Sequence, residues 1–295
     1  INAYNPDVIL AVGGGSTIDI AKQTNVLAAQ TNSLMFTEQS LSKDISENNL
    51  NIKNNGLPLI AIPTTAGTGS EVTQFATVWD YRSQHKKSLS HSSMYAKKAF
   101  IDPDFLSQVP LRVAISTGFD ALNQAFESIW NLNANELTRM VSRQAAVLSL
   151  KSLAIINESP TNNGLRRNLS LSSLYAGLAI SQTRTSICHS ISYPLTLKYG
   201  IEHGMACSFS MLEVFKYNSA FIKDDIEYIR LNINQDPYTA LESIFKQHEI
   251  HHHLAKLIKE KSSFSDSIDE FITTGRFENN IRKCDRSDLI RIIND

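Results

Sequence analysis

The chain has 295 residues, 42 % of them hydrophobic, and its formal net charge is −1. This length is enough for about two domains. The net charge is close to zero and the sequence has no long run of lysine and arginine, which argues against nucleic acid or an anionic membrane as a partner. The three scattered cysteines, Cys188, Cys207 and Cys284, do not form the pattern of a disulfide framework. With no secretory leader and no apolar span, they predict a cytoplasmic protein with reduced thiols.

Residues 1–109 have the pattern of an α/β domain. Short apolar runs end in clusters of glycine, proline, serine and threonine, as is typical of buried parallel strands and the loops after them. A helix is expected from Ser16 to Ala29, and the polar stretch 31–56 is expected to be a surface excursion. Because a strand follows Ile1 within a few residues, the first part of this domain is expected to be missing. Strands are expected at Val8–Val12, Leu59–Ile62, Ala76–Trp79 and Ala99–Ile101.

Residues 110–295 change to helical periodicity with few strand signals, which predicts an all-α domain. The segment containing His248 and the histidine run 251–253 is expected to be an exposed helical stretch and not a metal site. Helices are expected at Asp120–Trp130, Glu136–Ile156, Asn168–Ile180, Gly204–Tyr217, Ala240–Glu260 and in a last segment that ends at Ile293.

Two loops rich in glycine and hydroxyl side chains follow the first two strands. In Gly13–Ser16, glycines let backbone amides approach a phosphate, and the next helix offers a positive N-terminus. Ser16 and Asp19 have the spacing of a capping box. The second loop is 63–71, with sequence PTTAGTGSE. Either loop alone could be an ordinary turn, but both at one sheet edge predict a dinucleotide site, and neither matches the phosphate loop of NTPases.

A second group of residues has the composition of a metal site. Asp120 and Gln124 share one helix face at i, i+4 spacing, and His189 and His203 follow further on. One carboxylate, one amide oxygen and two imidazoles can hold a divalent transition ion. From spacing alone, solvated helix residues and structural histidines explain the pattern as well.

Four motifs in this order resemble the iron-containing alcohol dehydrogenases: GGGSTIDIAK, PTTAGTGSE, IDPDFLSQVP with STGFDALNQAFES, and HSISYPLTLKYGIEHG. The resemblance implies a Rossmann-like nucleotide-binding domain, a helical metal-binding domain and an active site between them. It implies NAD or NADP and a divalent metal, Fe²⁺ or Zn²⁺, as cofactors. The implied cofactor-binding residues are Gly13, Gly14, Gly15, Ser16, Asp19, Lys22, Thr64, Thr65, Thr68 and Ser70. The implied metal ligands are Asp120, His189 and His203, with Gln124 where the family usually has histidine.

Departures from the common pattern resemble the subgroup that reduces phosphonoacetaldehyde to 2-hydroxyethylphosphonate. Gln124 is one of them, and Tyr193, where many members have another histidine, is a second. The resemblance implies hydride transfer from NAD(P)H to a small aldehyde, with the metal polarising the carbonyl. Arg184 is a candidate for binding the phosphonate, and Tyr193 is a candidate proton donor.

Other readings stay open at this point. They are another short-chain alcohol or aldehyde dehydrogenase of the family, a lyase resembling dehydroquinate synthase, and an inactive truncated fragment that serves only in dimerisation. A homodimer is left open, and a small-molecule substrate is the expected partner, with no nucleic acid and no membrane.

Overall fold

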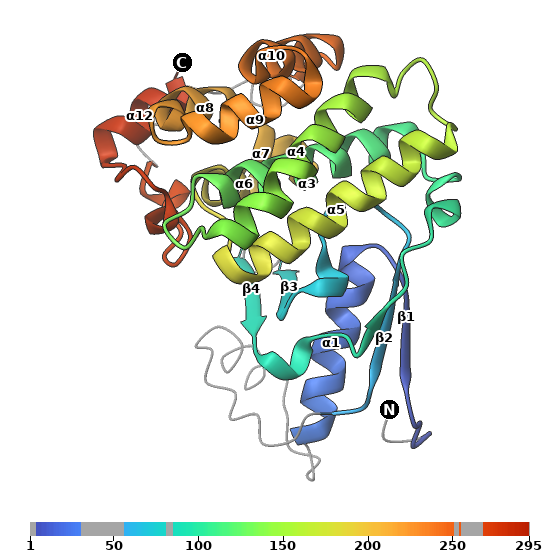
Figure 1. The fold of residues 1–295 in the computed structure, drawn as a ribbon. Helices are drawn as coiled ribbons and strands as arrows, with labels where there is room; N and C mark the ends of the chain where they lie inside the picture. The colour runs from blue at the N-terminus through green and yellow to red at the C-terminus, as the bar shows by residue number, and fades with distance from the viewer. Residues whose placement is uncertain (1–3, 31–55, 81–84, 251–253, 255–267, 295) are drawn as a thin grey trace.

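A computed structural model describes residues 4–30, 56–80, 85–250, 254 and 268–294. The expected surface excursion, apart from its last residue, and the histidine run 251–253 lie outside this part of the chain. Figure 1 shows a lower α/β part and an upper helical part, with a strand hairpin where the two meet.

The α/β part is built on a parallel sheet with the strand order β1-β2-β5. Ala11, Ile18, Leu59 and Ala61 form its small core against helix α1. The outer strand β1 leaves Leu10 58 % exposed, so this edge of the sheet is uncovered within the described chain. The predicted first two strands and the helix are confirmed, and the strand near residue 99 is shorter than expected. The bounds are β1 (Ile9–Gly13), α1 (Gly15–Gln30), β2 (Leu59–Pro63) and β5 (Lys98–Ala99).

The strand predicted at 76–79 exists, but it is not part of the parallel sheet. It belongs to β3 (Phe75–Asp80), which pairs in antiparallel register with β4 (His85–Ser90) in a separate two-stranded sheet. Ala76 of β3 and Leu89 of β4 pack on Val26 of α1. The hairpin thus extends the α/β part toward the helices (Figure 1).

The start of α1 differs from the capping box suggested by Ser16 and Asp19. The Asp19 carboxylate accepts hydrogen bonds from the Ser70 hydroxyl and, at 2.8 Å, from the backbone N–H of Thr77. The capping-box prediction is therefore wrong, because Asp19 ties the helix to the second loop and the hairpin.

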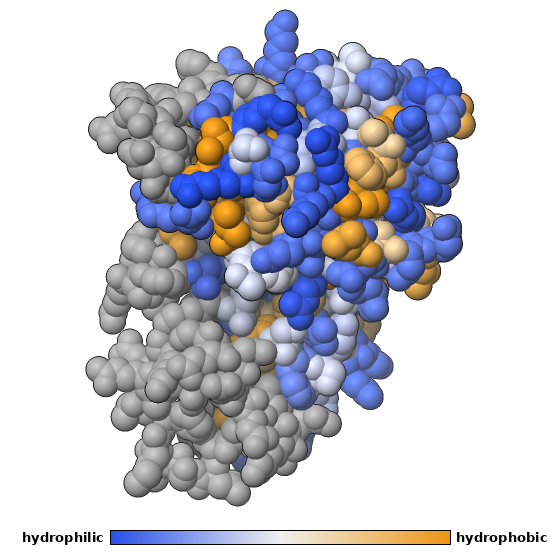
Figure 2. Space-filling view, turned by 90° about the vertical axis from the view of Figure 1, so that its left-hand side faces the viewer, coloured by the Kyte–Doolittle hydropathy of each residue, from blue (hydrophilic) through white to orange (hydrophobic). Residues whose placement is uncertain are grey.

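The helical part is centred on α3, which is buried along almost all of its second half. Phe126 and Trp130 stack there with ring centroids 5.5 Å apart. Among the described residues, no helix is both long and apolar enough to cross a membrane. On the face in Figure 2, hydrophobic residues form separate patches among hydrophilic ones. The bounds are α3 (Leu111–Ile129), α4 (Glu136–Ile155), α5 (Asn163–Thr183), α6 (Ile187–Tyr199), α7 (His203–Ser208), α8 (Met211–Asn218), α9 (Lys223–Ile233), α10 (Pro237–Gln247) and α12 (Arg286–Asn294).

Four features of the helical part differ from the sequence-based expectations. The helix expected at 204–217 is two helices, α7 and α8, and the helices α6 and α9 were not predicted. The helix expected from residue 240 to 260 ends at Gln247 within the described chain. His248 is not exposed, because it caps α10 and its Nε2 lies 2.9 Å from the Leu153 carbonyl.

Candidate active site

A cavity of about 360 Å³ lies between the glycine-rich loops and the helices. Both parts of the fold contribute to its walls, as expected for an active site between two domains. The predicted site residues that line it are Gly15, Ser16, Asp19, Thr68, Ser70, Asp120, Gln124, Arg184, His189, Tyr193 and His203.

The nucleotide side of this cavity is formed by the start of α1 and the second loop. A Cβ atom at Gly15 would lie only 2.5 Å from the Thr68 side chain, so the two loops touch where a side chain has no room. The amides at the start of α1 then border the cavity and suit an anionic phosphate. Of the other predicted residues, Gly13, Gly14, Thr64 and Thr65 are not among those that line the cavity.

Lys22 also lies outside the cavity. Its side chain is fully buried, and its ammonium donates hydrogen bonds to the carbonyls of Ser70, Thr73 and Phe75. Burial lowers the pKa of Lys22 to about 8, although Asp19 and Glu71 oppose that shift. The structure therefore makes Lys22 a brace for the second loop, and its contact with the cofactor stays a prediction.

The helical side of the cavity holds a compact cluster of potential metal ligands. Asp120, His189, His203 and Cys207 each present a ligand atom, and these atoms all lie within 4.8 Å of one another. The Nε2 atom of His189 is 3.4 Å from Oδ1 of Asp120. Two ligand atoms bound to one tetrahedral ion at about 2.0–2.2 Å are themselves about 3.4 Å apart. The donor set and its spacing therefore fit a divalent transition metal.

Gln124 lies beside this cluster in an orientation the sequence did not reveal. Its Nε2 donates to Oδ1 of Asp120 at 3.1 Å and to the Thr68 carbonyl at 3.4 Å. Its Oε1 is buried and has no hydrogen-bond partner within the described chain. An unpaired buried oxygen is costly, and the amide is held in this structure by its nitrogen alone.

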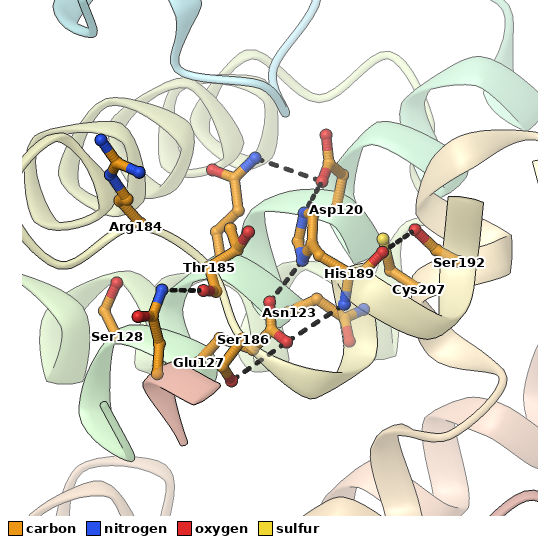
Figure 3. Close-up of polar contacts among 12 residues, drawn as sticks. Asp120, Asn123, Glu127, Ser128, Arg184, Thr185, Ser186, His189, Ser192 and Cys207 are labelled. Carbon is orange, nitrogen blue, oxygen red and sulfur yellow. Dashed lines mark hydrogen bonds and ion pairs between the residues drawn. The ribbon is translucent and has the colours of Figure 1, made fainter. Parts of the chain in front are cut away.

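Glu127, which sequence reasoning missed, holds His189 from the opposite side. Its carboxylate accepts from Nδ1 of His189, from the His189 backbone N–H at 3.1 Å and from the Ser186 hydroxyl at 3.2 Å. Figure 3 shows His189 between Asp120 and Glu127, with Cys207 nearby. A carboxylate on one ring nitrogen leaves the other free to bind a metal. The only sequence signal for Glu127 was its position two helical turns after Asp120.

The charged groups in the cluster shift one another's protonation. Burial opposes ionisation of Asp120, but hydrogen bonds and charges from His189 and His203 outweigh it and lower the pKa of this carboxyl. Burial alone would raise the pKa of the Cys207 thiol, but the two histidines lower it to about 7. The carboxyl of Asp120 and the thiol of Cys207 therefore ionise more readily than burial alone would allow.

Tyr193 lies next to the cluster, and its ring stacks on His203 with centroids 6.2 Å apart. The Lys86 ammonium lies 3.6 Å from the centre of the tyrosine ring. Burial would raise the pKa of Tyr193, but Lys86, Arg276 and His189 together lower it to about 7. A phenol with such a pKa can both give and take a proton near neutral pH.

Two arginines line another part of the cavity. The guanidinium carbons of Arg184 and Arg276 lie 5.7 and 5.8 Å from the centre of the same Phe75 ring. Within the described part of the chain, neither is paired with a carboxylate, and burial and Arg276 both lower the pKa of Arg184. Figure 3 places Arg184 on the other side of Asp120 from Cys207. Arg276 was missed because it comes from a segment remote in sequence.

The backbone of Arg184 is unusual, with φ at 64° and ψ at −178°. This region is almost restricted to glycine and costs other residues about 1–3 kcal/mol. The conformation is held by hydrogen bonds to the Arg184 carbonyl from Thr183 at 2.9 Å and Asn131 at 3.3 Å. An arginine kept at such a cost points to a use for its side chain.

Comparisons with known proteins agree with this arrangement. Residues 1–103 match the family described as iron-containing alcohol dehydrogenase, and residues 114–295 match the C-terminal part of the same family. The chain belongs to the iron-containing alcohol dehydrogenase family. Its fold is the one that family has, a Rossmann-like N-terminal part followed by a helical part. The resemblance seen in the sequence is confirmed.

Two family members acting on anionic aldehydes are among the similar proteins. The phosphonoacetaldehyde reductase of Streptomyces viridochromogenes is 32 % identical over 75 % of this chain and 55 % of its own length. The solved sulfoacetaldehyde reductase of Bifidobacterium kashiwanohense, in complex with NAD⁺, has a TM-score of 0.84 and 25 % identity over 99 % of this chain and 77 % of its own. This member of the iron-containing family thus spans about half the length of the curated relatives it matches.

Proposed function

We propose that the protein containing this chain is a metal-dependent reductase that transfers hydride from NADH or NADPH to a small aldehyde with an anionic group. Phosphonoacetaldehyde, giving 2-hydroxyethylphosphonate, is the substrate we propose first. We assign residues 1–109 to nucleotide binding and 110–295 to metal binding and catalysis. The observation that carries the proposal is one cavity lined by the loop at the start of α1, the ligand cluster and two arginines.

The metal is assigned to Asp120, His189 and His203, with Gln124 as the remaining predicted ligand. When bound, it supplies Lewis acidity that makes a carbonyl more electrophilic. Glu127 fixes the ring of His189, because its carboxylate contacts both the ring Nδ1 and the backbone N–H. The dinucleotide is assigned to the loop at Gly15 and Ser16, whose backbone amides border the cavity.

The substrate's anionic group is assigned to Arg184 and Arg276. Both guanidinium groups lie at the cavity without a carboxylate partner in the described chain. A planar guanidinium binds a phosphonate through two parallel hydrogen bonds. Two such groups suit a doubly charged phosphonate and leave a neutral aldehyde without these contacts. Tyr193 is the proposed proton donor to the product oxygen.

The test is an assay of the purified natural protein that contains this chain. NADH and NADPH oxidation is followed with phosphonoacetaldehyde, sulfoacetaldehyde, succinic semialdehyde and propanal, before and after removal of metal by a chelator. We expect loss on chelation, recovery with Fe²⁺ or Zn²⁺, and the highest kcat/KM with phosphonoacetaldehyde. A preference for propanal would instead indicate a general short-chain alcohol dehydrogenase, and activity that survives complete metal removal would refute metal dependence.

A matched pair of variants locates the metal. Asp120→Asn keeps the size of a side chain in the ligand cluster but removes its charge, whereas Asp104→Asn makes the same change at an exposed position outside the cavity. We expect Asp120→Asn to lose bound metal and activity together. Asp104→Asn should keep both. Equal metal content in the two variants would contradict the assignment.

A further inference from the structure

We infer that the Cys207 thiolate is itself a ligand of the metal and completes the donor set with Asp120, His189 and His203. The inference rests on the metal-dependent function proposed above and deepens it. It adds a sulfur donor to a site assigned so far to oxygen and nitrogen atoms, and this donor predicts a spectroscopic property that can be measured without catalysis.

The position of Cys207 follows from the helix that carries it. His203 is the first residue of α7, and Cys207 follows it by one helical turn, so both side chains leave the same face. The sulfur lies 3.8 Å from Nε2 and 3.9 Å from Nδ1 of His203. A thiolate and an imidazole bound to one ion at about 2.3 and 2.0 Å would be about 3.5 Å apart. The sulfur is therefore within a few tenths of an ångström of a ligand's position.

The surroundings of Cys207 favour a ligand over a structural thiol. The residue is fully buried, yet the neighbours that define its cluster are the carboxylate of Asp120 and the rings of His189 and His203. Structural buried cysteines normally pack in apolar surroundings and are inert. Two anionic donors, Asp120 and Cys207, would also balance the charge of a divalent ion.

Gln124 is the competing donor for the same role. Its amide nitrogen, and not its oxygen, faces Asp120, and this nitrogen also contacts the Thr68 carbonyl. To present its oxygen to an ion beside Asp120, the amide would have to turn and give up both hydrogen bonds. Cys207 needs no such turn, because its sulfur already lies with the other ligand atoms.

A sulfur donor changes which metals the site prefers. Thiolates are soft ligands that select zinc and other later transition metals over Mg²⁺ or Mn²⁺, whereas an amide oxygen favours harder ions. We therefore expect the site to retain Zn²⁺ or Co²⁺ far better than Mn²⁺.

The experiment is cobalt substitution of the natural protein that contains this chain. Co²⁺ bound to a thiolate gives an intense near-ultraviolet charge-transfer band that oxygen and nitrogen ligands alone do not give. We expect the band in the wild type, its loss in Cys207→Ser, and its persistence in Gln124→Ala. Cys207→Ser should also weaken Co²⁺ binding by about 10- to 100-fold or more, the range seen when even an outer partner of a ligand is lost.

Cys188→Ser is the matched control, because Cys188 is also buried but is not part of the ligand cluster. The band should be unchanged in this variant. Circular dichroism shows whether each variant is folded, and Cys207→Ala offers a second removal of the sulfur should the serine variant fail to fold.

The outcomes separate this inference from the proposed function. A protein that binds cobalt and reduces the aldehyde without the band, or a band that persists in folded Cys207→Ser or Cys207→Ala, overturns the sulfur ligand alone. A folded wild type that binds no cobalt, zinc or iron overturns the metal-dependent function and the inference together.

Discussion

Two substitutions of Arg184, one to glycine and one to alanine, separate the function of its side chain from the strain in its backbone. Both remove the guanidinium from the cavity. They differ in the backbone, because φ is 64° and ψ is −178° at this position, a region that suits glycine and not alanine. We therefore expect the two variants to lose the same function but to differ in stability.

The size of both effects can be worked from the structure. Loss of a charge-assisted contact costs about 1.5–3 kcal/mol, or about 10- to 100-fold in kcat/KM for phosphonoacetaldehyde. Relief of the backbone strain favours glycine by about 1–3 kcal/mol, less about 0.4–1 kcal/mol for the greater freedom of glycine in the unfolded chain. Arg184→Gly should thus be about 1 kcal/mol more stable than Arg184→Ala, and should melt about 2–4 °C higher.

The assay combines thermal unfolding with kinetics on phosphonoacetaldehyde and propanal. Arg230→Gln, at an exposed arginine paired with Glu227, is the control for loss of a positive charge. Activity on propanal should stay within a few-fold in every variant. Equal losses on both substrates would make Arg184 structural, and an alanine variant as stable as the glycine variant would refute the strain argument.

Three further predictions concern the groups around the cluster. Glu127→Gln presents an amide to Nδ1 of His189 and should weaken metal binding by about 10- to 100-fold while the protein stays folded. Metal titration measures this affinity, and an unchanged affinity would exclude a positioning role for Glu127. Lys86→Met removes the charge beside Tyr193 and should raise its pKa from about 7. Because Tyr193 must be protonated to donate a proton, kcat for aldehyde reduction by the wild type should fall as pH rises through about 7. In Lys86→Met the same fall should come at higher pH. Coincident kcat profiles would exclude Tyr193 as the proton donor. Gly204→Ala should release metal although it changes no ligand, because its Cβ would lie 1.8 Å from a carbonyl oxygen of α3; full metal content by elemental analysis would contradict this.

Local patterns in the sequence were sufficient for much of the fold and part of the site. Strand ends followed by glycine-rich loops predict the nucleotide side, because parallel strands bring their carboxyl ends to one sheet edge. The spacing of Asp120 and Gln124 predicts a shared helix face, and the structure places both at the cavity.

The features that were missed depend on contacts between distant segments. Glu127 and Cys207 come close to the other site residues only because α6 and α7 pack against α3. Arg276 reaches the cavity from a segment far along the chain. Asp19 and Lys22 were read as cofactor contacts from a local motif. In the structure, Asp19 lines the cavity and also ties the second loop and the hairpin to α1, whereas Lys22 lies outside the cavity and braces the loop. A motif gives the position of a polar residue, but only tertiary packing decides its partner.

The distance between the nucleotide side and the ligand cluster is set by backbone packing without intervening side chains. A Cβ atom at Gly69, in the second loop, would lie 2.4 Å from Cα of Gly177 in α5. The two parts of the fold thus touch backbone to backbone at this point, and such a contact cannot be adjusted by a change of rotamer. Because Lys22 holds the carbonyls of Ser70 and Thr73 on the other side of the same loop, the loop is fixed from both directions. The spacing between the second loop and the helical part is therefore built into the packing of the loop against α1 and α5. Lys22 and Gly177, which do not line the cavity, thus help to determine its dimensions.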